Sequence, residues 1–129
     1  MTMTTKPSIS LSGRWRNQLG SLLELEGDGD GGIHGKFCNS VGSEAGRWQP
    51  LRGWYDPSAG QGSNVIGFVV DWTGLHCITA WSGQYRPGTD TISATWTMTT
   101  ACEADDEWKA TVVGHDVFHR DDGPEGADS

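Results

Sequence analysis

The chain has 129 residues, which is enough for one domain with a hydrophobic core but not for two. Its 17 Asp and Glu residues outnumber its 9 Lys and Arg residues, and the formal net charge of −8 argues against nucleic acid or an anionic membrane as a partner. No apolar run in the sequence approaches the roughly 20 residues that are needed to span a bilayer.

Turn-forming residues divide the chain into short segments in which Val, Ile, Thr and Trp are frequent. Clusters of Gly, Ser, Asp and Asn recur about every 8–12 residues, a spacing typical of an all-β sandwich or barrel. In chain order, strands are expected at residues 13–17, 21–26, 33–39, 48–56, 65–72, 76–85, 91–100 and 108–120. No segment has a convincing apolar period of about 3.6 residues, so we predict no helix. These short consecutive strands predict an eight-stranded antiparallel up-and-down β-barrel (a meander) with a ligand pocket at one end.

The two ends of the chain differ in composition from the segments between them. We predict a flexible N-terminal segment over residues 1–10, a barrel domain over residues 11–120 and a flexible acidic tail over residues 121–129. The start, MTMTTKPSIS, lacks the apolar stretch of a signal peptide. We therefore expect either that a signal peptide has been removed or that the protein stays inside the cell.

Alternation along each predicted strand separates inward from outward side chains. In SLLELEG, Ser21 shares the inward face with two leucines, because the two glutamates require water. The same alternation places these residues inward: Phe68, Val70, Trp72, Cys77, Thr79, Trp81, Ile92, Ala94, Trp96, Met98, Val112, Gly114, Asp116 and Phe118. The chain has seven tryptophans, more than the packing of so short a chain requires, so the inward ones indicate an aromatic-lined pocket.

Near the C-terminus, the sequence VGHDVFHR sets His115 directly beside Asp116. Adjacent strand residues point to opposite sides of a sheet, so these two side chains cannot form one catalytic site. A buried carboxylate must be hydrogen-bonded or paired. We predict that Asp116 accepts hydrogen bonds from N–H groups of a ligand, with a purely structural acceptor as the alternative. The sequence has no nucleophile–base set, metal cluster or phosphate loop, so we do not expect an enzyme.

Seven motifs occur along residues 11–120 in the order LSGRWRNQLGS, VGSEAG, LRGWYD, GFVVDW, TAWSGQY, TWTMT and DEWKATVVGHDVF. In this order they resemble the avidin and streptavidin family of biotin-binding proteins, and WSGQY followed by WKATVVGHD is a highly specific combination. Streptavidin is itself a standard example of an eight-stranded barrel that holds one small ligand. The resemblance implies high-affinity, non-covalent binding of biotin without a cofactor or metal. It also implies a secreted protein that sequesters this nutrient.

The resemblance assigns roles to the candidate site residues. Asn17 and Ser21 would donate hydrogen bonds to the ureido oxygen of biotin, and Asp116 would accept one from a ureido N–H. Thr79 would lie near the ring sulfur. The bicyclic ring would be enclosed by Trp72, Trp81 and Trp96.

The resemblance further implies a homotetramer rather than a dimer. Trp108 matches a tryptophan of the family that reaches into the pocket of a neighbouring subunit. Val113 and His115, which face outward, would then lie at a subunit interface.

Several positions depart from the family pattern. Phe37 stands where the family usually has a tyrosine whose hydroxyl also donates to the ureido oxygen, a hydrogen bond worth about 1.5–3 kcal/mol. Asn39 replaces the serine of streptavidin-like members but can still donate. The loop VGSEAG contains Val41 and Ser43 and is expected to close over the carboxylate tail of the ligand, with Ser43 in place of an asparagine. Cys77 replaces a serine near that tail, and a thiol is a weak donor. We therefore expect tight binding that is weaker than in the best family members.

Two other functions are compatible with a tryptophan-rich β protein. A carbohydrate-binding module would present tryptophans on an outer face, and a lipocalin-like carrier would have an apolar interior. The three cysteines do not suggest a disulfide framework: Cys38 is expected to face outward, Cys77 inward, and Cys102 to lie exposed in an acidic turn.

Overall fold

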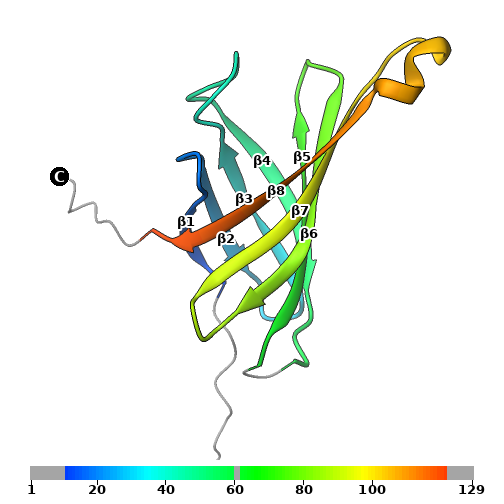
Figure 1. Cartoon of the computed structure of the whole chain (residues 1–129). Coiled ribbons are helices and arrows are strands. Elements are labelled where there is room, and N and C mark those ends of the chain that lie inside the picture. The colour runs from blue at the N-terminus through cyan, green and yellow to red at the C-terminus, as the bar shows by residue number, and fades with distance from the viewer. Residues whose placement is uncertain (1–10, 60–61, 122–129) are drawn as a thin grey trace, which may run out of the picture.

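Eight antiparallel strands run around one closed barrel in the computed structural model, which describes residues 11–59 and 62–121 (Figure 1). The strands are β1 (Gly13–Arg16), β2 (Leu22–Gly27), β3 (Gly32–Cys38), β4 (Trp48–Tyr55), β5 (Asn64–Trp72), β6 (Cys77–Arg86), β7 (Thr91–Thr100) and β8 (Thr111–Arg120). Each strand pairs with the next one in the chain, and β8 closes the barrel against β1. The predicted meander is confirmed. Of the predicted terminal segments, residues 1–10 and 122–129 lie outside the described residues.

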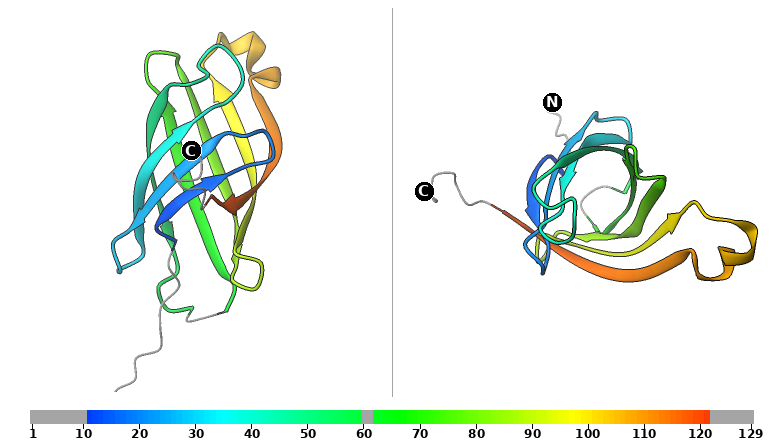
Figure 2. Two further views of the ribbon diagram at one scale, coloured as in Figure 1. Left: turned by 90° about the vertical axis from the view of Figure 1, so that its left-hand side faces the viewer. Right: turned by 90° about the horizontal axis from the view of Figure 1, so that it is seen from above.

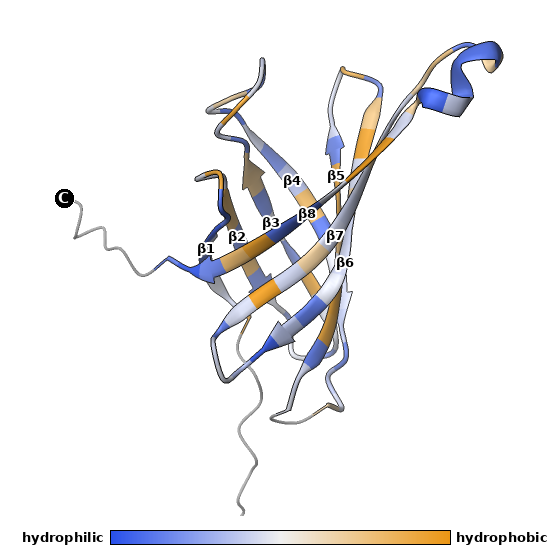
Figure 3. Cartoon of the chain, viewed as in Figure 1, coloured by the Kyte–Doolittle hydropathy of each residue, from blue (hydrophilic) through white to orange (hydrophobic). Residues whose placement is uncertain are grey.

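The inward face of the strands forms the hydrophobic core. Leu23 and Leu25 are at most 2% exposed, whereas Glu24 between them is directed outward and pairs with charged groups on neighbouring strands. Along β5, Phe68 and Val70 are buried in the same way. Hydrophobic and hydrophilic residues therefore alternate along the strands in Figure 3. This period of two is the pattern that the sequence predicts for a barrel with a filled interior.

One end of the barrel is closed by side chains. Trp15 is fully buried, and its indole N–H donates to the carbonyl oxygen of Leu11 at 3.1 Å. The guanidinium of Arg120 lies 4.1 Å from the centroid of the Trp15 ring and also binds the carboxylate of Asp90 at 3.1 Å. The hydroxyl of Tyr85 donates to the same carboxylate at 2.9 Å. The opposite end, where the β1–β2, β3–β4, β5–β6 and β7–β8 connections lie, is the open end of the barrel.

The β7–β8 hairpin extends beyond the barrel at the open end, as Figure 2 shows in the view from above. Its tip is a short 3₁₀ helix, η1 (Ala104–Lys109), which the sequence analysis did not predict. Three acidic residues in its first turn and Lys109 in its last turn suit the helix dipole, but six residues are too few to show a helical apolar period. Val112 has the predicted inward parity but is 47% exposed, because β8 has left the barrel at that point.

Candidate functional site

A cavity of about 200 Å³ lies inside the barrel near its open end. Its wall is formed by Asn17, Leu19, Ser21, Phe37, Asn39, Val41, Trp72, Thr79, Trp81, Trp96, Met98 and Asp116. These residues come from five of the strands and from the β1–β2 and β3–β4 connections. The volume is below the range of about 300–1,000 Å³ that is usual for drug-sized ligands, so the cavity suits one small molecule.

Asp116 is the one charged residue of this wall, and it is 5% exposed. Its carboxylate accepts hydrogen bonds from the indole N–H of Trp81 at 2.9 Å and from the side-chain amide of Gln18 at 2.8 Å. Both donors are neutral, and a carboxylate has about four acceptor positions. Acceptor capacity therefore remains for N–H groups of a ligand.

His115, the neighbour of Asp116, lies on the outer surface. One of its ring nitrogens lies 2.8 Å from the hydroxyl of Ser93, and the other lies 3.2 Å from the hydroxyl of Thr95. The predicted separation of His115 from Asp116 is confirmed, because the two side chains are on opposite faces of β8.

Asn17 and Ser21 are held by the turn that connects β1 to β2. The side-chain oxygen of Asn17 accepts the backbone N–H groups of Leu19 at 3.0 Å and of Ser21 at 2.9 Å. Both amide oxygen lone pairs are thus used, which leaves the NH₂ group of this 7% exposed side chain as the donor at the cavity wall. The turn fixes the orientation of the amide before any ligand binds.

The hydroxyl of Ser21 already has an acceptor role. It accepts the backbone N–H of Ser40 at 2.9 Å and lies 3.2 Å from both the side-chain oxygen of Asn39 and the hydroxyl of Ser40. Because the Ser40 hydroxyl donates to the carbonyl oxygen of Leu19 at 2.7 Å, the proton of Ser21 points to one of these two oxygens. A ligand oxygen in the cavity could receive that proton instead.

Aromatic rings form most of the remaining wall. Trp81 is stacked on Phe68 with a centroid distance of 4.9 Å, and the ring of Phe37 lies 5.0 Å from it on a tilted plane. Trp72 meets Phe37 edge-on at 6.0 Å and donates its indole N–H to the hydroxyl of Thr79 at 2.8 Å. The hydroxyl proton of Thr79 remains available to another acceptor. These contacts fix the aromatic rings in place without a ligand.

Three of the candidate residues do not line the cavity. Ser43 is exposed in the β3–β4 connection, and Trp108 is 82% exposed on η1 at the tip of the projecting hairpin. Cys77 is half-buried beside a separate hollow that is also lined by Asp71 and His76. Burial raises the pKa of the Cys77 thiol, and the nearby Asp71 carboxylate raises it further. The assigned roles of these three residues remain predictions, as do the roles of the residues that the cavity does bring together.

Several contributors were missed by the sequence analysis. Leu19 lines the cavity and Gln18 binds Asp116, while Met98, which alternation had placed inward, lines the cavity without having been assigned to the site. The amide oxygen of Gln18 also accepts the backbone N–H of Val117 at 3.0 Å, so Gln18 joins the β1–β2 turn to β8. A signal was present in NQLGS, since a tight turn cancels strand alternation and lets consecutive polar side chains reach one site.

The described part of the chain contains free thiols at Cys38 and Cys77, both half-buried, and at the exposed Cys102. Within residues 11–59 and 62–121, no group of three or more His, Cys, Asp or Glu side chains is placed to hold a metal ion. In the same ranges, no helix is long and apolar enough to cross a membrane.

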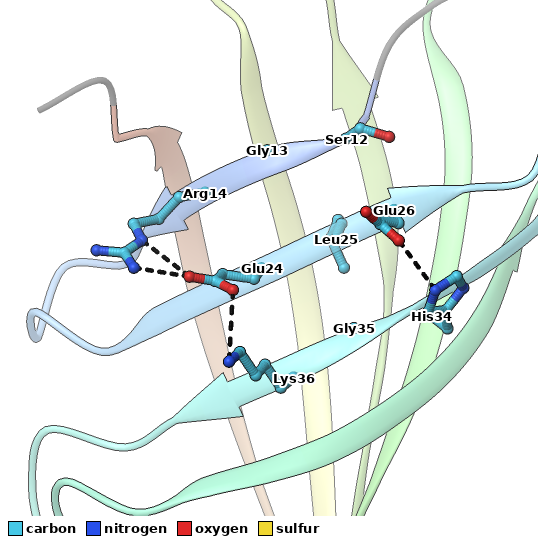
Figure 4. A pocket seen from close by; sticks show the side chains of 9 residues that line it. All are labelled: Ser12, Gly13, Arg14, Glu24, Leu25, Glu26, His34, Gly35 and Lys36. Carbon is cyan, nitrogen blue, oxygen red and sulfur yellow. Dashed lines mark hydrogen bonds and ion pairs between the residues drawn. The ribbon is translucent and has the colours of Figure 1, made fainter. Parts of the chain in front are cut away.

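A larger hollow of about 520 Å³ lies on the outer surface of β1, β2 and β3 (Figure 4). Its charged side chains are satisfied by one another. Glu24 lies 2.7 Å from Arg14 and 3.8 Å from Lys36, and Glu26 lies 3.1 Å from His34. This surface is typical of a solvated sheet face, so the barrel cavity is the candidate site.

Comparisons with known proteins identify the family of the chain. The model of the avidin family matches residues 5–121. Avidin-related protein 6 of Gallus gallus is 31% identical over 118 residues, which cover 86% of this chain and 77% of that protein. Avidin of Gallus gallus is 28% identical over 118 residues, which cover 86% of this chain and 78% of avidin. The chain therefore belongs to the avidin family.

Proposed function

We propose that this protein binds biotin non-covalently in the barrel cavity and that it has no catalytic activity. Membership of the avidin family supports biotin as the ligand. The observation that carries the proposal is the buried carboxylate of Asp116, which has only neutral donors and faces a small aromatic cavity. An uncompensated charge in such a place is costly, and a ligand with N–H groups would stabilise it.

The donors and acceptors of the cavity match the ureido group of biotin, which has two N–H groups and one carbonyl oxygen. Asp116 would accept from one N–H. The amide of Asn17 and the hydroxyl of Ser21 would donate to the oxygen, and Asn39 would donate to the same group. Thr79, whose oxygen already accepts from Trp72, would direct its proton toward the ring sulfur.

The apolar part of the ligand would be enclosed by Trp72, Trp81 and Trp96. At the open end of the cavity, the tail would pass Leu19, Val41 and Met98, with Ser43 and Cys77 further out. Because Phe37 has no hydroxyl and a thiol is a weak donor, we expect affinity below that of the tightest family members.

We further propose that the protein is a homotetramer in which Trp108 completes the pocket of a neighbouring subunit. Trp108 is 82% exposed on the hairpin that leads away from its own barrel (Figure 2). The outer face of β5 to β8 is poor in charge and exposes Val65, Val69, Ile78 and Val113, whereas β1 to β3 carry the ion pairs of Figure 4. A face that carries so few charges favours contact between subunits, with Val113 and His115 inside it.

The substitution Asp116→Ala tests the pocket. We expect biotin affinity to fall by a factor of ten or more in a calorimetric titration, because a buried charge-assisted hydrogen bond is worth about 1.5–3 kcal/mol. Asp71→Ala is the matched control, since Asp71 is an exposed carboxylate on the outer face of β5. Equal affinities of Asp116→Ala and the wild type, with both folded by circular dichroism, would refute the assignment of Asp116.

A further inference from the structure

Gly114 and Trp96 are directly opposite each other in the β7–β8 pair. A Cβ atom added at Gly114 would overlap Cζ2 and Cε2 of the Trp96 ring and would lie 2.9 Å from Cη2. Carbon atoms that are not bonded approach comfortably only to about 3.5–4.0 Å. The indole of Trp96 therefore lies on the bare backbone of Gly114, in space that any side chain would occupy.

The backbone conformation does not explain this glycine. Gly114 is absent from the residues with positive φ, so its backbone is accessible to any L-amino acid. Other strand glycines have a different reason: a Cβ at Gly53 or Gly83 would collide with the backbone of a neighbouring strand. Among the glycines that the structure describes, Gly114 is the one whose missing side chain makes room for a ring of the cavity wall.

The neighbouring pair repeats the arrangement. Asp116 lies opposite Ala94, so Trp96 and Asp116 each face a small partner across the β7–β8 pair. β7 runs from the closed end toward the open end, which places Trp96 nearer the entrance than the Ala94–Asp116 pair. A ligand that is held at Asp116 would therefore present its next ring at the level of Trp96.

We propose that Gly114 is a specificity-determining residue that sets the width of the cavity by holding Trp96 against β8. With alanine at this position, the indole must move away from β8 and into a cavity of only about 200 Å³. The cavity would then accept a cyclic urea with one ring but not a bicyclic urea. The class of ligand in this inference rests on the proposed function. The position of Trp96 against Gly114 does not depend on that function.

The experiment compares two ligands on Gly114→Ala: biotin, and desthiobiotin, which keeps the urea and the acid tail but lacks the sulfur-containing ring. We expect Gly114→Ala to weaken biotin at least tenfold more than desthiobiotin. In a Trp96→Ala background, the same substitution should change neither affinity by more than about twofold, because the ring that it displaces is absent. Gly88→Ala is the control, since a Cβ there meets nothing within 4 Å. Equal losses for both ligands, or an undiminished loss in the Trp96→Ala background, would overturn the inference.

A second measurement uses the ligand-free protein and therefore does not depend on which ligand it binds. The fall in melting temperature caused by Gly114→Ala should be smaller in the Trp96→Ala background than in the wild type, and near-ultraviolet circular dichroism should change only where Trp96 is present. If the wild type binds neither urea, the proposed function fails, and these two readouts still decide the role of Gly114. An equal fall in melting temperature in both backgrounds, with an unchanged near-ultraviolet circular dichroism spectrum, would contradict the proposed role of Gly114.

Discussion

The ring of Phe37 fills the space between Trp72 and Trp81 without offering a hydrogen bond. It is 3% exposed, and its centroid lies 6.0 Å from that of Trp72 and 5.0 Å from that of Trp81. It therefore supports the aromatic wall by packing alone. The hydrogen-bond donors that remain at the cavity wall include the amides of Asn17 and Asn39 and the hydroxyls of Ser21 and Thr79.

The substitution Phe37→Tyr should slow the release of biotin. A hydroxyl at this cavity wall would add a donor to the ureido oxygen, and one such hydrogen bond is worth about 1.5 kcal/mol or more, or roughly tenfold in rate. The off-rate can be measured by displacement of a fluorescent biotin derivative. An unchanged or faster off-rate would show that the missing hydroxyl is not what limits affinity.

At this scale, strand alternation was sufficient to find most of the site. It placed Ser21, Thr79 and Asp116 inward, and each of them is at most 5% exposed. Alternation could not find Gln18, because the β1–β2 turn reverses the chain between Asn17 and Ser21 and removes the period of two. It also could not reveal that Gly114 gives space to Trp96, since that depends on a contact between two strands.

The elements at the closed end of the barrel are joined by a polar network. Arg120 at the end of β8 binds Asp90 in the β6–β7 turn, which also receives the hydroxyl of Tyr85. The hydrogen bond from Arg120 is the main reason why the pKa of Asp90 is lowered, with a further contribution from Tyr85, and partial burial opposes them.

This network predicts a pH-dependent contribution to stability. A carboxyl whose pKa is lowered by folding stabilises the protein above its unfolded pKa of about 4, and this contribution is lost as the pH falls through the lower folded pKa. Asp90→Asn should therefore destabilise the protein at pH 7 but hardly at all well below pH 3. The effect should be at most about 1 kcal/mol, because the Asp90 side chain is 43% exposed.

Melting temperatures of the ligand-free protein at one concentration would measure this difference. Asparagine is a suitable replacement because Asp90 has a φ of 55°, a conformation that asparagine tolerates. Asp71→Asn, on the outer face of β5, serves as the control. A destabilisation by Asp90→Asn that is the same at both pH values would rule out the ionised pair as its cause.

Element boundaries were predictable wherever turn residues and alternation agreed. All eight strands were found, and their ends differ from the prediction by three residues or fewer. The η1 helix was missed because its stability comes from local charges and backbone turns rather than from an apolar face, and none of its residues is buried.

On the scale of the whole molecule, the outer surface of the barrel is divided in two. Charged pairs cover β1 to β3, and valine, isoleucine, threonine and serine side chains cover β5 to β8. The number and order of the strands were enough to predict a closed barrel. The sequence alone did not show that the outer surface is divided into a charged part and a part that carries few charges. Strand alternation gives the face of each residue, while the division requires the order of the strands around the barrel.

The substitution Val113→Arg should dissociate the proposed tetramer. Val113 is 67% exposed on β8, and a desolvated charge within an interface is strongly unfavourable. Molar mass from light scattering should fall to that of a smaller assembly. His34→Arg adds the same charge to the ion-paired face and should leave the mass unchanged. A wild-type protein that is monomeric would contradict the proposed assembly directly.

The central claim, that the barrel cavity binds biotin, is tested most directly by calorimetric titration of the purified wild-type protein with free biotin. The geometry around Asp116 and the aromatic wall predicts one site per chain with strongly exothermic binding and a raised melting temperature. The absence of heat, together with an unchanged melting temperature, would contradict it.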